Sequence, residues 1–179
     1  MKPRLLILSD MWGLDHCDWI TYYQELLDPA FSIRLLDSCD LGDVDATDGG
    51  EAAIHAAFTH GGIATAAQRL LDMEKEKVDI LAFSIGGTIA WEAGMKGLAI
   101  GRLHAVSATR LRLQRKKPGF PVHLYYGSDD PFQPTADWFV KMGIAPAFIE
   151  RGAHDFHTRP ASARRIHATI MADRGVQDP

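Results

Sequence analysis

Short apolar runs alternate along the chain with longer segments in which apolar residues recur at helical spacing. The short runs contain few polar residues, as expected for parallel strands that are buried on both faces. Six strands are predicted, at residues 5–8, 31–36, 78–83, within 98–106, 122–126 and 147–150. Helices are predicted at residues 19–27, 51–77 with a break at Gly61-Gly62, 86–96, 135–142 and 162–173.

This order of elements predicts the fold class. Repeated strand–helix units give an α/β protein, a three-layer sandwich in which a mostly parallel sheet of about six strands carries helices on both faces. A length of 179 residues suits a single domain, residues 1–179. Residues 37–50 are acidic and aperiodic and are predicted to form a surface loop, and Asp18 and Asp48 are predicted to cap the helices that follow them.

Unusual polar residues follow four of the predicted strands. Asp10 comes after the first strand, Ser84 after the third, Asp130 after the fifth and His154 after the last. The carboxyl ends of parallel strands meet at one edge of the sheet, where loops carry the functional groups of such folds. We therefore expect these residues to gather in one site.

Ser84 stands between a buried strand and a helix that begins at once. A sharp turn there needs small residues two positions before and after the serine, and Ala82 and Gly86 supply them. Residues 82–86 resemble the nucleophile elbow of the α/β-hydrolase fold, G-x-S-x-G, with Ala82 in place of the first glycine and Phe83 in place of a frequent histidine. A serine that caps a closely packed helix would explain the same residues.

Two later segments extend this resemblance. Residues 127–130 resemble the G-x-x-D segment that carries the acid of the catalytic triad, and residues 152–156 resemble the G-x-x-H-x-F-type segment that carries its histidine. The order Ser84, Asp130, His154 is the triad order of this fold. Asp129 remains a competitor for the acid, and His157 is a weaker candidate for the histidine.

The first strand ends in a segment that resembles an oxyanion loop. In residues 9–14, Trp12-Gly13 match the His-Gly-Trp-Gly pattern of small esterases, whereas Asp10 and Met11 replace its histidine and glycine. The resemblance implies that the N–H groups of Trp12 and Ile85 form the oxyanion hole, with Met11 as an alternative donor. An inward-pointing Asp10 would oppose the oxyanion.

Substrate contacts are expected from Met11, Phe83 and Phe132, although ordinary core packing would also explain these side chains. A basic segment follows the fourth strand, with its cations at Arg110, Arg112, Arg115, Lys116 and Lys117. These residues could attract an anionic substrate or carrier to the site. A solvated loop kept soluble by its charges is the simpler interpretation.

Composition and charge argue against several other classes of protein. A net charge of -4 gives no global reason to expect nucleic acid, and no apolar stretch approaches the length of a membrane span. The first apolar run ends at Ser9-Asp10, too early for a signal peptide, so a cytoplasmic protein is expected. No metal-type spacing of Cys and His is present, and no metal is expected. Cys17, between His16 and Asp18, is interpreted as a loop cysteine rather than a nucleophile.

The resemblance implies a serine hydrolase that cleaves a carboxylic ester or thioester of a small molecule through an acyl-enzyme, as a carboxylesterase does, without a cofactor. The chain resembles the compact, lidless members, because it starts at what would be the family's third strand. The usual lid position holds only residues 109–120. A non-catalytic binding protein and an acyltransferase that uses the same serine remain alternatives.

Overall fold

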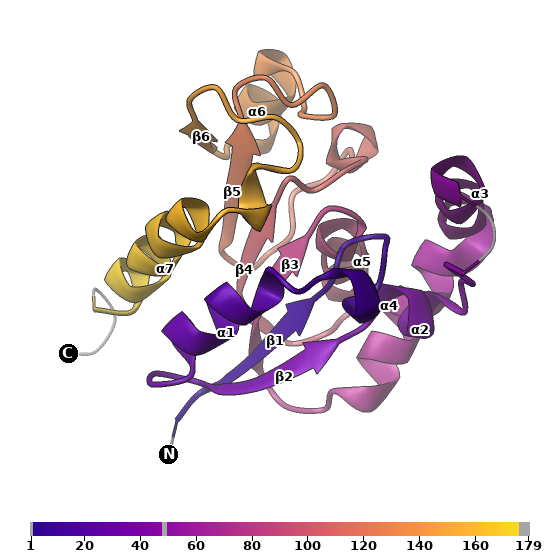
Figure 1. Ribbon diagram of the computed structural model, residues 1–179, viewed down its shortest axis with the longest axis horizontal. Helices are drawn as coiled ribbons and strands as arrows, with labels where there is room; N and C mark the ends of the chain where they lie inside the picture. Colours follow the sequence, from indigo (N-terminus) through magenta and orange to yellow (C-terminus); the bar gives the residue numbers. More distant parts are fainter. Residues whose placement is uncertain (1, 48–49, 176–179) are drawn as a thin grey trace.

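The computed structural model describes residues 2–47 and 50–175 (Figure 1). Its six strands form one fully parallel sheet in the order β2-β1-β3-β4-β5-β6. They are β1 (Arg4–Leu8), β2 (Ser32–Leu36), β3 (Val78–Phe83), β4 (Ile100–Val106), β5 (Val122–Gly127) and β6 (Ala147–Ile149). Each lies inside a predicted run or within one residue of it, and the predicted α/β fold is confirmed.

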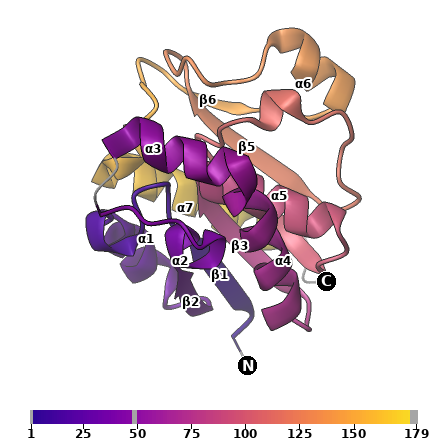
Figure 2. The same cartoon turned by 90° about the vertical axis from the view of Figure 1, so that its right-hand side faces the viewer.

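Helices cover both faces of the sheet. On one face, α1 (Ile20–Leu27) contacts α7 (Pro160–Gly175), and on the other α4 (Ile63–Met73) packs against α5 (Ile85–Met95). Figure 2 shows α4 and α5 in front of the strands and α7 behind them. Successive strand residues point to opposite faces, so Leu6 and Leu8 enter one core while Leu5 and Ile7 enter the other.

Two local predictions were wrong. Residues 38–42 form a short helix, α2 (Ser38–Gly42), whose N-terminus is capped by the Asp37 carboxylate and which packs against α4. Five residues are too few to show a helical period, so only the tertiary contacts reveal this helix. Asp18 makes no side-chain cap, because α1 begins at Ile20 with Trp19 at the cap position. The predicted cap at Asp48 lies outside the described residues.

The long alanine-rich helix is divided as expected. It consists of α3 (Gly50–Ala57), a π-helical turn (Phe58–Gly62) and α4, with Gly61 at a φ of 146°. This break lets α3 project beyond the sheet, at the right-hand edge of Figure 1. The chain also contains α6 (Ala136–Met142), which is capped by Thr135.

The sheet order determines where a site can form. The chain leaves β1 toward β2 and then returns to the other side of β1 to form β3. Open parallel sheets bind ligands at the carboxyl ends of strands beside such a switch. The loops after β1 and β3 carry Asp10 and Ser84 at this point. None of the described helices has the length and apolar character needed to cross a bilayer.

Candidate active site

Ser84 sits on a sharp turn between β3 and α5. Its backbone is in an unusual conformation, with φ 47° and ψ −115°, and its side chain is almost fully buried. Gly86 is needed because a Cβ there would lie 2.5 Å from the carbonyl oxygen of Ser9, and Gly87 because a Cβ would lie 2.6 Å from Ala108. The first turn of α5 thus packs against the loops after β1 and β4, as a nucleophile elbow requires.

The loops after β3, β5 and β6 bring together the three residues expected to form a triad. Ser84 Oγ lies 3.1 Å from His154 Nε2, and His154 Nδ1 lies 2.9 Å from Asp130 Oδ2. With its proton on Nδ1, the imidazole donates to Asp130 and offers Nε2 to the serine hydroxyl. The His154 side chain is partly exposed, whereas the Asp130 carboxylate is fully buried.

The structure separates the two candidate acids and the two candidate histidines. Asp130 is 1% exposed and its second oxygen accepts the Phe132 N–H, whereas Asp129 is exposed and accepts from the Ser128 hydroxyl. His157 lies behind His154, where its Nδ1 is 3.1 Å from the His154 carbonyl oxygen. The geometry therefore favours Asp130 and His154 as partners of Ser84.

The segment expected to form the oxyanion hole differs from the prediction at one N–H donor, that of Trp12. The Trp12 N–H is occupied, because it donates to Asp10 Oδ1 at 2.9 Å. The N–H groups of Met11 and Ile85 make no hydrogen bond within the described parts of the chain, and Ile85 stands at the positive N-terminus of α5. The donors left free are thus Ile85 and the alternative, Met11.

Asp10 points into the site, the orientation that would oppose an oxyanion. Its side chain is 8% exposed, and burial raises the pKa of its carboxyl group, while the Trp12 and Cys17 hydrogen bonds and His154 act in the opposite direction. Among the described residues, Asp10 forms no ion pair. The site therefore contains a buried acid without a cation to match it.

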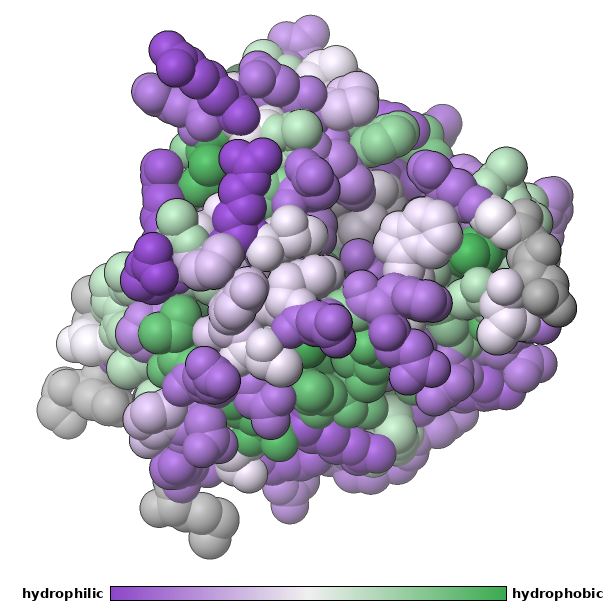
Figure 3. All heavy atoms as spheres, viewed as in Figure 1, coloured by the Kyte–Doolittle hydropathy of each residue, from purple (hydrophilic) through white to green (hydrophobic). Residues whose placement is uncertain are grey.

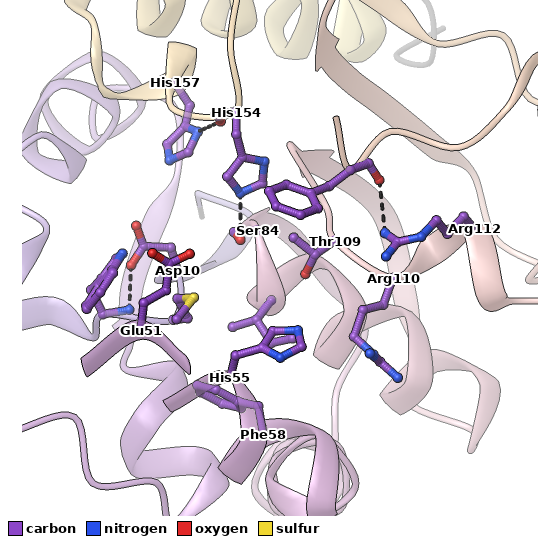
Figure 4. A pocket seen from close by; sticks show the side chains of 14 residues that line it. Asp10, Glu51, His55, Phe58, Ser84, Thr109, Arg110, Arg112, His154 and His157 are labelled. Carbon is purple, nitrogen blue, oxygen red and sulfur yellow. Dashed lines mark hydrogen bonds between the residues drawn. The ribbon is translucent and has the colours of Figure 1, made fainter. Parts of the chain in front are cut away.

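A pocket of about 300 Å³ opens over Ser84 (Figure 4). Met11, Trp12 and Phe132 line it, as the sequence suggested for Met11 and Phe132. Figure 4 shows Asp10 and Glu51 on one side of the serine and Arg110 and Arg112 on the other. The remaining lining residues are His55, Phe58, Ile85, Thr109, His154 and His157.

Sequence reasoning missed the wall that α3 and the π-helical turn after it contribute. Glu51, His55 and Phe58 all line the pocket. Their spacing of four and then three residues places them on one face of a helix, which was a detectable signal. No helical insertion occupies residues 109–120, which contain one short 3₁₀ turn, so the segment after β2 covers the site instead.

The prediction that Phe83 contacts substrate was wrong. Phe83 is fully buried in the core below α1, with its ring 4.7 Å from those of Trp19 and Tyr23. Strand alternation explains the error, because the last residue of β3 points to the α1 face and the turn at Ser84 faces the loops. Figure 3 shows that hydrophilic residues cover much of the face seen in Figure 1, with apolar residues in smaller patches between them.

Only part of the basic segment reaches the site. Arg110 and Arg112 line the pocket, and Arg112 donates to the Phe132 carbonyl oxygen at 3.3 Å. Arg115 lies along a separate groove, Lys116 is exposed and Lys117 donates to the Gly143 carbonyl oxygen at 2.9 Å. The expectation of five cations at the site is corrected to two, because the chain turns away after the 3₁₀ turn.

One group of described residues could supply three ligand atoms to a metal. Atoms of His104, His123 and Asp173 lie within 4.8 Å of one another, on β4, β5 and α7. The imidazole rings are stacked with centroids 4.7 Å apart and planes 16° apart, so their in-plane lone pairs do not converge. His123 already pairs with Asp173 at 3.2 Å.

Both cysteines are buried thiols. Burial and the neighbouring Asp10 carboxylate raise the pKa of Cys17 far above its usual range, and burial together with Asp37 raises the pKa of Cys39 to about 12. A thiol that stays protonated is a weak nucleophile. The structure thus supports the interpretation of Cys17 as a packing residue.

Solved structures with this fold are numerous. A Xanthomonas campestris protein of the alpha/beta hydrolase superfamily matches 96% of this chain and 99% of its own, with a TM-score of 0.68 and 18% identity. Mouse alpha/beta hydrolase domain-containing protein 10 matches 99% of this chain and 92% of its own, with a TM-score of 0.73 and 11% identity.

A third match is a dienelactone hydrolase-like promiscuous phosphotriesterase from metagenomic libraries. It covers 96% of this chain and 84% of its own, with a TM-score of 0.70 and 18% identity. No protein-family model and no curated protein matches the sequence. The chain has the α/β-hydrolase fold, in a compact form.

Proposed function

We propose that this protein is a serine hydrolase that cleaves an ester-type bond of a small molecule through a Ser84–His154–Asp130 triad. The observation that carries the proposal is the continuous hydrogen-bonded line from Ser84 Oγ through both nitrogens of His154 to Asp130 Oδ2. The positive φ of Ser84 also supports the proposal, because strained backbone conformations of this kind cluster at functional sites. Structural neighbours with hydrolase names support the same class.

The reaction follows from the positions of the protons. His154 Nε2 removes the proton of Ser84 Oγ as the oxygen attacks the substrate carbonyl, and Asp130 stabilises the imidazolium that forms. The imidazolium then protonates the leaving alcohol or thiol, which leaves an ester on Ser84. Water, deprotonated by His154, attacks this ester and releases the acid and the free serine.

The negative charge on the carbonyl oxygen needs donors. Ile85 N–H at the start of α5 is one, and the second comes from the Met11–Trp12 pair. Met11 N–H has no hydrogen-bond partner in the part of the chain that the structure describes, and Trp12 N–H can donate to the oxyanion once it leaves Asp10. Each such donor typically accelerates acyl transfer by about 10²–10³-fold.

The pocket limits the substrate to a small molecule, since its volume is about 300 Å³. Arg110 and Arg112 on one wall favour an anionic group on the leaving portion of the ester. We further propose that the protein is cytoplasmic and acts on small molecules rather than on nucleic acid or membranes. The triad chemistry needs neither a metal nor an organic cofactor.

The first test is hydrolysis of p-nitrophenyl acetate and butyrate by wild type and Ser84→Ala, with a fluorophosphonate probe applied to both. Ser32→Ala, at an exposed position of β2, is the matched control. We expect turnover and labelling in wild type and in the control, and neither in Ser84→Ala. Product analysis with added alcohols or thiols distinguishes hydrolysis from acyl transfer. A wild type that neither turns over nor takes the probe would favour a binding protein.

A further inference from the structure

On one side of the pocket, two side chains each keep a hydrogen-bond acceptor that has no donor among the described residues. Asp10 contributes a carboxylate whose hydrogen bonds within the described residues both end on Oδ1, from Trp12 N–H at 2.9 Å and Cys17 Sγ at 3.3 Å. Its Oδ2 is left for another partner. Figure 4 shows this carboxylate and the His157 ring on the same side of Ser84, and both residues line the pocket.

His157 is the second acceptor. Its Nδ1 is 3.1 Å from the carbonyl oxygen of His154, so Nδ1 carries the proton and Nε2 presents a lone pair. The side chain is 2% exposed, and Nε2 has no hydrogen-bond partner in the described structure. Trp19 and Phe83 pack against the ring, with centroids 4.7 and 5.4 Å away, and hold it in place.

Buried polar groups are almost always paired, and an unmatched carboxylate in a pocket is costly unless a ligand supplies the partner. Glu51 adds a second negative charge on this wall, whereas the cations Arg110 and Arg112 line the opposite one. The group that would give these acceptors their donors and match the charge of the carboxylate is therefore a cation with several N–H donors. A primary ammonium has three.

We propose that Asp10 and His157 form a subsite for an amino group next to the scissile carbonyl, so that the preferred substrates are esters of amino acids. This inference rests on the proposed hydrolase function. It also explains how an acid can lie beside the oxyanion hole. A bound ammonium neutralises the Asp10 charge, so the carboxylate no longer opposes the negative oxygen of the tetrahedral intermediate.

The test compares two substrates of nearly the same shape, L-alanine benzyl ester and benzyl isobutyrate, in which an ammonium replaces a methyl group. At a pH of about 6.5 the amino group is largely protonated. We expect wild type to show a kcat/KM at least tenfold higher for the alanine ester. Asp10→Asn keeps an oxygen for the Trp12 N–H but lacks the charge, and should reduce this ratio at least tenfold.

Asp15→Asn removes the same charge from an exposed site in the same loop and should keep the wild-type ratio. Thermal unfolding checks that Asp10→Asn folds, and Asp10→Ser is the second variant. A wild-type ratio near one, or a ratio that survives in both Asp10 variants, would overturn the subsite.

The subsite can fail or hold independently of the hydrolase function. Calorimetry with Ser84→Ala measures binding of the intact alanine ester, which we expect to be at least tenfold tighter than binding of benzyl isobutyrate. Adding Asp10→Asn should remove this difference. Selective binding without turnover by wild type would reject the hydrolase and keep the subsite, whereas probe labelling with equal binding of both esters would do the reverse.

Discussion

Ser107 Oγ donates a hydrogen bond of 2.7 Å to the main-chain carbonyl oxygen of His154. Ser107 is fully buried at the end of β4, with a φ of 48°, and its N–H bonds the carbonyl oxygen of Tyr125 on the neighbouring strand. The loop that carries His154 is thereby attached to the strand beside β3, on which Ser84 stands. Ser107, which is outside the proposed triad, thus helps to hold the His154 loop close to Ser84.

Replacing Ser107 with alanine should therefore lower kcat for p-nitrophenyl esters by about 10–100-fold, because small displacements of a catalytic group have effects of this size. KM should change much less, since Ser107 does not line the pocket. Steady-state kinetics measure both constants, with Ser32→Ala as the control. An unchanged kcat would mean that other contacts hold the His154 loop.

Asp130 and its neighbour Asp129 provide a matched pair of acids. Asp130→Asn should lower kcat by about 10³–10⁴-fold, because an amide cannot hold the Nδ1–H tautomer or stabilise the imidazolium. Asp129→Asn should remain within a few-fold of wild type, since its carboxylate is exposed and contacts the Ser128 hydroxyl. Ester hydrolysis by both variants measures the difference. Equal losses would contradict the assignment of Asp130.

The backbone conformation of Ser84 should lower the stability of the folded protein. Its positive φ is strained in any residue with a Cβ, at a typical cost of about 1–3 kcal/mol. The free energy of unfolding of Ser84→Gly should therefore be about 1 kcal/mol higher than that of Ser84→Ala, although both variants lack the Ser84 hydroxyl. Urea denaturation of the two variants measures this difference directly. A Ser84→Ala variant as stable as Ser84→Gly would show that the turn carries no strain.

Acid should destabilise the protein through His104. Burial, with the nearby His123 and Arg102, lowers the pKa of His104 to about 3, whereas an unfolded histidine titrates near 6.5. The unfolded chain takes up this proton first, so stability is complete above pH ~6.5 and declines as pH falls toward 3. The slope from this one site reaches about 1.4 kcal/mol per pH unit.

The test is urea denaturation between pH 7 and 4. His104→Gln retains groups that can bond the Tyr125 hydroxyl, which lies 2.9 Å from His104 Nδ1, and should show a shallower loss of stability than wild type. His16→Gln, at an exposed position, serves as the control. The same pH slope in wild type and His104→Gln would contradict the prediction. His157, with a pKa also lowered to about 3 by burial, adds to the wild-type slope.

Much of the fold follows from the sequence alone. Short runs rich in apolar residues, such as residues 78–83, and the helical periods between them predict every strand and every helix of eight or more residues. Buried strands and helices with an apolar face leave strong local patterns. The sharp turn at Ser84 could also be predicted from the sequence, because the steric need for small residues at Ala82 and Gly86 lies within five residues. The α2 helix left no such pattern.

The tertiary structure decided what depends on distances between segments remote in the chain. Asp129 and Asp130 are adjacent in sequence, and they are distinguished by the position of His154 Nδ1 and by the burial of Asp130. Phe83 and Phe132 are equally apolar, but strand direction places one in the core and a loop places the other at the pocket. The charge on Asp10 could be read from the sequence. Its orientation toward Ser84 and His157 could not, because it results from the packing of four loops at one edge of the sheet.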